Sequence, residues 1–301
     1  MTIAIYARPT LGQRVAGPFV ASVEFLRLLS KRPVGFAGFI GCVFFLFLAF
    51  VAPLFVPLKN DPSLAEIYQT PSLAHPLGTD FQGKDVLNQI VYGGRDILTI
   101  AILAAFFSTT IAITFGSIAA TVGGRVDAAI VAITDVILTV PQLVLLIAVA
   151  AILRPTSFLF LAVILALLQW SSLLRQIRSQ VLSLKERDYV EAARSLDLGL
   201  PHIIFREMLP SMRSYIAIHF ILAMTQAMYA QVGIIILGLV PISGTNWGIM
   251  LYFAQGQGAL FFRDSLWYIL SPILAIVLVQ LSLVSFASGL EEIFNPRLRG
   301  A

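Results

Sequence analysis

The chain has 301 residues, of which 58% are apolar and 12% are charged, and its formal net charge is +4. The charged share is about half of the ~25% that soluble domains usually have, and the mean hydropathy is +0.89. This composition excludes a soluble enzyme, a disordered chain and a small disulfide-linked domain, and it indicates an integral membrane protein. The single cysteine, Cys42, lies in an apolar run and is expected to be a small buried residue.

Residues 1–33 are predicted to form a cytoplasmic leader. The first ten residues lack the apolar core of a cleavable signal peptide. Between residues 19 and 31, apolar residues recur at helical spacing, namely Phe19, Val23, Leu26 and Leu29. This pattern predicts an amphipathic helix on the inner membrane surface that ends before Pro33, and an ordinary polar leader is the alternative.

Residues 34–301 are predicted to form one transmembrane domain, because they contain six apolar runs of about the ~20 residues that a membrane-spanning helix needs. The runs are residues 34–56, 97–122, 128–153, 157–174, 215–240 and 266–290. With the N-terminus in the cytoplasm, 15 of the 20 lysines and arginines fall in cytoplasmic segments. Because such segments are enriched in Lys and Arg, both termini are predicted to be cytoplasmic. The predicted fold class is an all-α membrane protein with six transmembrane helices.

The first loop on the predicted outer side, residues 57–96, contains four prolines and is expected to be extended and rich in turns. Within it, residues 84–92 are predicted to form a short interfacial helix, because their apolar side chains would share one face. His75 is expected to shape a turn rather than bind a metal, since the sequence offers no second ligand close to it. The last outer loop, residues 241–265, is rich in glycine and aromatic residues.

The loop at residues 175–212 mixes both charge signs with apolar residues at helical spacing. Residues 186–196 favour a helix, and Gly199 and Pro201 after them suit a turn and the first position of another helix. A second short helix is predicted at residues 201–208, ending before Pro210. Two short helices joined by a sharp turn would form a compact projection from the membrane.

This projection has the features of a docking surface. Ala192 and Ala193 would keep one of its faces small, so that the surface of a partner protein can approach closely. Two interpretations remain open for four apolar side chains in the same segment: contact with a partner, or packing against the chain's own helix ends. These side chains are Leu196, Ile203, Ile204 and Phe205.

The sequence lacks the motifs of several kinds of catalytic site. It contains no G-x-x-x-x-G-K-[ST] for nucleotide phosphates, no H-E-x-x-H or C-x-x-C for a metal, and no G-x-S-x-G nucleophile. Its three histidines, His75, His202 and His219, are far apart in the sequence. We therefore predict a non-catalytic membrane pathway that binds no metal, cofactor or nucleic acid.

Polar residues in the fifth apolar run indicate a substrate path. Tyr215, His219, Gln226 and Tyr229 are spaced by four, seven and three residues, which places them in one stripe along a helix. Polar groups inside a membrane usually face a bundle interior or a water-filled cavity, and hydrogen bonding between helices is the alternative. Asp135 is the one carboxylate well inside a run, and it is expected to stabilise the fold by pairing with a backbone or basic group.

Several motifs resemble those of a known family. The loop contains the triplet Glu191-Ala192-Ala193 followed by Leu209-Pro210, and it resembles the E-A-A loop of permeases of binding-protein-dependent ABC importers. Residues 187–196 and 203–210 resemble the dipeptide/oligopeptide/nickel branch of that family. Further segments resemble the same branch over about residues 33–297: HPLGTD at 75–80, GKDVL at 83–87, YGGR at 92–95, GGRVD at 123–127, DVILTVP at 135–141, WGIM at 247–250 and NPR at 295–297.

The resemblance implies the type I ABC importer permease fold and a multi-pass location in the inner membrane of the cell. It implies a permease subunit that forms half of the path for di- or oligopeptides, with nickel complexes or oligosaccharides as alternative substrates. A stand-alone secondary transporter is a further alternative. The implied partners are a second homologous permease, two cytoplasmic ABC ATPases that bind ATP and Mg, and an extracytoplasmic substrate-binding protein.

The resemblance also implies which residues dock on the ATPase and transmit its motion: Glu191, Ala192, Ala193, Leu196, Asp197 and Gly199. One position departs from the family pattern, because Asp197 stands where glycine is usual, six residues after the glutamate. Aspartate tolerates the left-handed conformation better than most residues, and the nearby Gly199 is the alternative residue for the turn.

Overall fold

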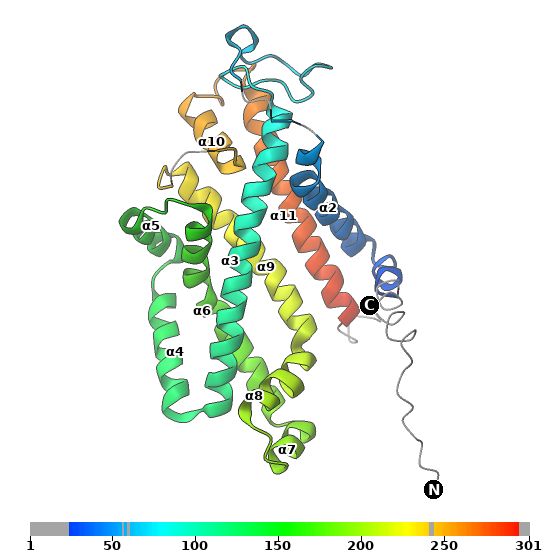
Figure 1. Cartoon of the computed structure of the whole chain (residues 1–301), viewed down its shortest axis with the longest axis vertical. Helices are drawn as coiled ribbons and strands as arrows, with labels where there is room; N and C mark the ends of the chain where they lie inside the picture. Colours follow the sequence, from blue (N-terminus) through cyan, green and yellow to red (C-terminus); the bar gives the residue numbers. More distant parts are fainter. Residues whose placement is uncertain (1–23, 56, 59–60, 241–243, 295–301) are drawn as a thin grey trace.

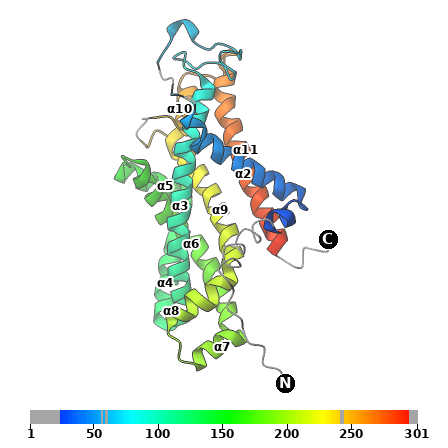
Figure 2. The same ribbon diagram turned by 45° about the vertical axis from the view of Figure 1, so that its right-hand side comes forward.

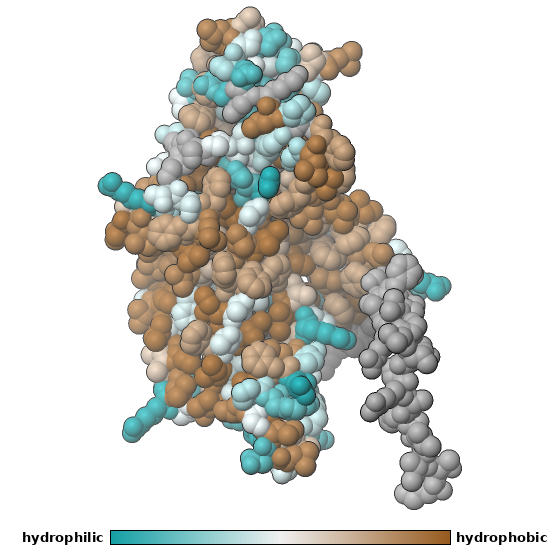
Figure 3. Space-filling model, in the orientation of Figure 1, coloured by the Kyte–Doolittle hydropathy of each residue, from teal (hydrophilic) through white to brown (hydrophobic). Residues whose placement is uncertain are grey.

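The computed structural model describes residues 24–55, 57–58, 61–240 and 244–294, and every regular element in these ranges is helical. Figure 1 shows the long helices running along the molecule, with α3 at the centre. Helix α7 marks one end, called the α7 end here, and the loop at residues 61–85 lies at the other, called the α10 end. Apolar residues cover the middle of the face in Figure 3, and polar residues gather at both ends. This distribution matches a bilayer-spanning bundle.

The helices follow one another along the chain, and the longest described connection, residues 67–85, leads to α3. Their bounds are α2 Pro33–Phe50, η1 Ala52–Leu54, η2 Leu64–Glu66, α3 Val86–Val122, α4 Gly124–Thr139, α5 Gln142–Leu153, α6 Phe158–Lys185, α7 Asp188–Ser195, α8 Leu200–His202, a π-helical turn Ile203–Met208, α9 Leu209–Ile236, α10 Trp247–Gly256 and α11 Leu266–Phe294. Five of the described helical segments are long and apolar enough to cross a membrane, and the bent pair of α4 and α5 makes a sixth when it is taken as one span.

The predicted amphipathic helix at residues 19–31 lies partly outside the described residues. Residues 24–29 are helical, and Leu29 is fully buried while Leu26 is exposed. The Leu29 side chain lies close to Gly35 and Gly289, where α2 meets α11. This helix therefore packs partly on the bundle.

Helix α3 begins well before the predicted second span. It starts at Val86 and continues for 37 residues, so residues 84–92 do not form the separate interfacial helix that we predicted. The Asp85 side chain caps its start by accepting from the backbone N–H of Asn88 at 2.7 Å. Gly93 and Gly94 of this helix lie against the Trp247 ring, which a Cβ atom at these positions would approach to 2.8 and 3.0 Å.

The third predicted span is broken into two helices. The axes of α4 and α5 differ by 89°, and the break falls at Val140 and Pro141. Proline has no N–H for the helical ladder, and the residue before it is driven to an extended conformation, as the ψ of 130° at Val140 confirms. The sequence contained this signal, but the length of the apolar run favoured one straight helix.

The fourth and fifth spans also extend into the loop at residues 175–212. Helix α6 continues past its predicted end at residue 174 to Lys185. The second short helix does not end before Pro210, because α8, the π-helical turn and α9 form one continuous segment. The backbone N–H of Leu209 donates to the Ile204 carbonyl, five residues back. This wider turn lets the helix continue through Pro210, which has no N–H to donate.

Helix α2 packs mainly on α11 (Figure 2), and glycines make the close approach possible. A Cβ atom at Gly35 would lie 2.5 Å from the Cα of Gly289, and one at Gly38 would lie 2.5 Å from the backbone nitrogen of Phe286. Small residues at such crossings allow helix backbones to meet in a membrane. The remaining core forms two clusters, one around α3, α9, α10 and α11 and one between α3, α6 and α7 at the α7 end.

Candidate functional site

Residues 186–202 contain α7 and α8 and project from one end of the bundle (Figure 1). We call this segment the α7 projection. Arg187 is extended and separates α7 from α6. At its other end α7 stops in a Schellman motif. The N–H of Leu198 donates to the Ala193 carbonyl at 3.2 Å, and the N–H of Asp197 donates to the Arg194 carbonyl at 2.9 Å.

Asp197 itself adopts the left-handed conformation at this turn, with a φ of +53°. Gly199 has a φ of −59°, so it does not take over the turn, and that alternative is wrong. The departure from the family pattern thus leaves the turn in place. Because an L-residue other than glycine is strained there, Asp197 carries a local cost.

This strain gives a testable prediction. Asp197→Gly is expected to raise the stability of the chain by up to about 1 kcal/mol, and Asp197→Val to lower it by about 1–2 kcal/mol, because a β-branched residue is strongly disfavoured at positive φ. Thermal unfolding of the purified chain in detergent measures both. The control is Ser195→Val, at an exposed position in ordinary helical conformation. Equal melting of the two valine variants would contradict the prediction.

The predicted docking residues differ in exposure. Glu191, Ala192, Asp197 and Gly199 are exposed, and Leu196 is 73% exposed. Ala193 is buried with Val190 in the cluster at the α7 end. The two alanines cannot share one face as we expected, because consecutive residues in a helix point about 100° apart.

The structure also separates the four apolar residues of this segment. Ile203 and Ile204 are buried and pack against the chain's own helices, whereas Leu196 and Phe205 are exposed. Of the predicted docking and apolar residues, those exposed on or beside the α7 projection are Glu191, Ala192, Leu196, Asp197, Gly199 and the neighbouring Phe205.

Two ion pairs join α4 to α6 between this projection and the middle of the bundle. Asp127 receives two hydrogen bonds from the Arg178 guanidinium, at 2.5 and 2.6 Å. Asp135 pairs with Arg175, which confirms its expected partnership with a basic group. The pair of Asp135 and Arg175 is about half exposed and contributes little, whereas the paired geometry at Arg178 fixes orientation more strongly.

A polar cavity of about 290 Å³ lies between α3, α5, α6 and α9. The 89° bend between α4 and α5 precedes Gln142, the first residue of α5, which lines this cavity. Ten residues line it: Ser108, Gln142, Gln169, Ser172, Leu173, Gln176, His219, Leu222, Ala223 and Gln226.

The cavity contains part of the predicted substrate-path stripe. His219 and Gln226 line it. Tyr215 lies beside it, because its hydroxyl is 3.4 Å from Oε1 of Gln176 and its ring centre is 4.2 Å from that of His219. Tyr229 is 58% exposed and does not line the cavity.

Sequence reasoning missed the polar residues that the other helices contribute to the cavity. Gln169, Ser172 and Gln176 are spaced by three and four residues in α6, which was a signal for a second polar stripe. Ser108 and Gln142 had no such pattern, because each is a single polar residue on its helix face. The cavity forms only where three or more helices bring these faces together.

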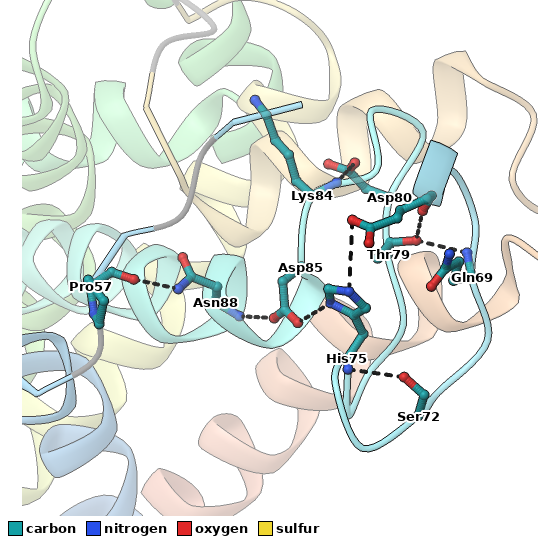
Figure 4. Close-up of polar contacts among 10 residues, drawn as sticks. Pro57, Gln69, Ser72, His75, Thr79, Asp80, Lys84, Asp85 and Asn88 are labelled. Atoms are coloured by element: carbon teal, nitrogen blue, oxygen red, sulfur yellow. Dashed lines mark hydrogen bonds and ion pairs between the residues drawn. The ribbon is translucent and has the colours of Figure 1, made fainter. Parts of the chain in front are cut away.

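At the α10 end, the loop at residues 61–85 is tied together by polar contacts (Figure 4). Asp80 is 2% exposed, and its carboxylate accepts from the backbone N–H groups of Gln82 and Lys84 at 2.8 and 2.9 Å and from Nε2 of Gln89 at 2.7 Å. Burial raises the pKa of the Tyr68 hydroxyl above its ordinary value, and the nearby Asp80 carboxylate raises it further.

His75 lies in a turn of this loop, as we expected. Its backbone N–H donates to Oγ of Ser72 and its carbonyl accepts from the backbone N–H of the same residue. The sequence did not indicate its acidic neighbours. Nδ1 of His75 is 2.9 Å from the Asp85 carboxylate, and Nε2 is 4.0 Å from that of Glu66. His75 thus connects the loop to the cap of α3.

Comparison with known proteins places the chain among membrane transport components. Residues 112–300 match the model of the family described as the binding-protein-dependent transport system inner membrane component. A protein of Brucella suis that is assigned as a peptide permease is 33% identical over 292 residues, which cover 95% of each chain.

Two proteins of Bacillus subtilis are similar over most of their length. The dipeptide transport system permease protein DppC is 28% identical over 275 residues, 91% of this chain and 85% of that protein. The oligopeptide transport system permease protein OppC is 28% identical over 276 residues, 91% of this chain and 88% of that protein. With the helical bundle and the family match over most of its length, this chain belongs to the family of inner membrane components of binding-protein-dependent transport systems.

Proposed function

We propose that the chain is the transmembrane permease subunit of an ATP-driven importer and forms half of a translocation path for di- or oligopeptides. The observation that carries this proposal is the similarity along 91–95% of the chain to proteins named for peptide transport. The polar cavity in the middle of an otherwise apolar bundle supports it, because polar groups at membrane depth usually line a path for a polar substrate.

The proposal includes an orientation and the type I importer permease fold. The α7 end would face the cytoplasm, because the excess of Lys and Arg lies in the segments that join the bundle at that end. Both termini would then be cytoplasmic. The α10 end, with its ordered loop at residues 61–85, would meet the substrate-binding protein.

The α7 projection would dock on a cytoplasmic ABC ATPase that binds ATP and Mg. Glu191, Ala192, Leu196, Asp197 and Gly199 would contact it directly, and the buried Ala193 would hold α7 against the bundle. Helix α6 runs without a break from Gln169 at the cavity to Lys185 beside α7. Movement of the projection would therefore be transmitted to the cavity by one rigid element, which shifts the balance between two packings of the bundle.

The proposed partners are a second homologous permease, two ATPases and the binding protein. Nickel complexes and oligosaccharides are the alternative substrates, and a stand-alone secondary transporter is the alternative mechanism. The few charges inside the spans argue against coupling to an ion gradient, because such coupling uses intramembrane ionisable groups.

Purification of the tagged chain from its native membrane in mild detergent tests the assembly. We expect mass spectrometry to identify a second permease and one or two P-loop ATPases, and the reconstituted assembly to import a labelled peptide only with ATP and the binding protein. A chain that purifies alone after cross-linking, and that transports with an ion gradient and no ATP, would contradict the proposal.

A further inference from the structure

The cavity between α3, α5, α6 and α9 is lined by hydrogen-bonding groups without fixed charge. None of its ten lining residues is Asp, Glu, Lys or Arg, and His219 is the only titratable one. Four are glutamines, which come from three helices: Gln142, Gln169, Gln176 and Gln226. A glutamine amide offers both a donor and an acceptor. The cavity is therefore suited to a ligand that both donates and accepts hydrogen bonds.

Among these four glutamines, Gln169 is buried, and its side-chain amide makes no hydrogen bond within the described residues. It is 9% exposed, and neither Oε1 nor Nε2 has a hydrogen-bond partner among the described residues. Other buried glutamines of the bundle differ, because Nε2 of Gln231 donates to the Ile97 carbonyl at 2.9 Å and Nε2 of Gln280 donates to the Thr225 carbonyl at 3.3 Å. A buried amide with both ends unpaired is costly for the fold, and a ligand that pairs with both ends removes this cost.

The two free ends restrict the chemistry of that ligand. A cation would pair with Oε1 alone, and an anion would pair with Nε2 alone. In an extended peptide, the N–H and C=O of one residue point to the same side, as in a β-ladder, where two residues exchange both hydrogen bonds. A side-chain amide can imitate the edge of a strand and pair with both groups. Such contacts do not depend on peptide side chains, since the main chain provides the affinity.

We propose that Gln169 binds the backbone of the transported peptide through paired hydrogen bonds, and that Gln226 and Gln176 extend this contact along the cavity. This inference rests on the proposed function, because it takes a peptide as the substrate. The volume of about 290 Å³ is close to the ~300 Å³ lower end of small-molecule sites. The path would then accept peptides with different side chains, but it would require the backbone N–H of the peptide residue that Gln169 binds.

The test uses the complete importer in proteoliposomes, with its binding protein and internal ATP. Import of labelled trialanine is compared with import of trialanine methylated at the central backbone nitrogen, and the ratio of the two rates is the readout. Any preference of the binding protein for one of the two peptides contributes equally to the ratio of every permease variant. It therefore cancels when a variant is compared with the wild type. Gln169→Leu is expected to lower the ratio about fivefold, as for the loss of one hydrogen bond, without loss of assembly, because it removes an unpaired buried group.

Gln231→Leu is the matched control, since it removes a buried glutamine that is bonded to its own chain. It is expected to lower stability and to keep the wild-type ratio. If Gln169→Leu fails to assemble, Gln226→Leu at an exposed cavity position gives the same comparison. A ratio unchanged in the cavity variants would overturn this inference and leave the peptide importer intact. A wild-type assembly that imports a nickel complex or an oligosaccharide, and no peptide, would overturn the proposed function and this inference with it.

Discussion

Replacement of Ala192 by arginine is expected to remove most of the ATP-driven transport while the chain stays folded. Ala192 is exposed on the α7 projection, beside the buried Ala193. Because Ala192 is exposed, the larger side chain can extend into solvent, so the change in stability should stay within about 0.5 kcal/mol. At the proposed contact with the ATPase, the same side chain would hold the two surfaces apart and place a charge in the interface. We expect transport to fall at least tenfold.

The measurement combines import into proteoliposomes, ATP hydrolysis by the same assembly and thermal unfolding of the chain. Ala192→Ser is the matched control, because serine is nearly as small as alanine and should retain most of the transport. The expected pattern is loss of import with continued hydrolysis, or loss of the ATPase from the purified assembly. Wild-type import by the Ala192→Arg variant would contradict the proposal that the α7 projection transmits the motion of the ATPase.

Helix bounds were predictable only in part from the sequence. The apolar runs located the spans, since bilayer thickness sets the length of each run. They did not give the ends, because α3 and α6 remain helical beyond the apolar stretch. The Asp85 cap of α3 is a local contact, but the Trp247 ring that packs on Gly93 and Gly94 comes from a segment far away in the sequence. Tertiary contacts thus extend helices into segments whose composition resembles loops.

The α7 projection was more predictable than the cavity. Its turn depends on local chemistry, and the tolerance of aspartate for the left-handed conformation anticipated the φ of Asp197. The cavity depends on how α3, α5, α6 and α9 face one another, and the break at Pro141 precedes Gln142 on its wall. A polar stripe on one helix cannot reveal the stripe opposite it. Sequence reasoning therefore found His219 and Gln226 but missed Gln169.

A substitution at the crossing of α2 and α11 is expected to have the second large effect, a loss of stability, because α2 is attached to the bundle mainly through α11. A Cβ at Gly35 would lie 2.5 Å from the Cα and 3.3 Å from the nitrogen of Gly289. A change of side-chain rotamer cannot relieve a clash with backbone, so the helices must separate. Gly35→Leu is expected to destabilise the chain by about 3 kcal/mol, at the upper end for overpacking.

Thermal unfolding in detergent and the fraction of monodisperse protein measure this loss. Gly256→Leu is the matched control, because a Cβ at Gly256 would meet no atom within 4 Å and its φ is not positive. The expected melting temperature is lower by several degrees for the Gly35 variant and close to wild type for the control. Equal melting of both variants would mean that α2 can move away from α11 at little cost. The glycines of this crossing would then not be what holds α2 to the bundle, and its attachment would depend on the contacts of Leu29 and the salt bridge between Arg32 and Glu292 at 3.3 Å.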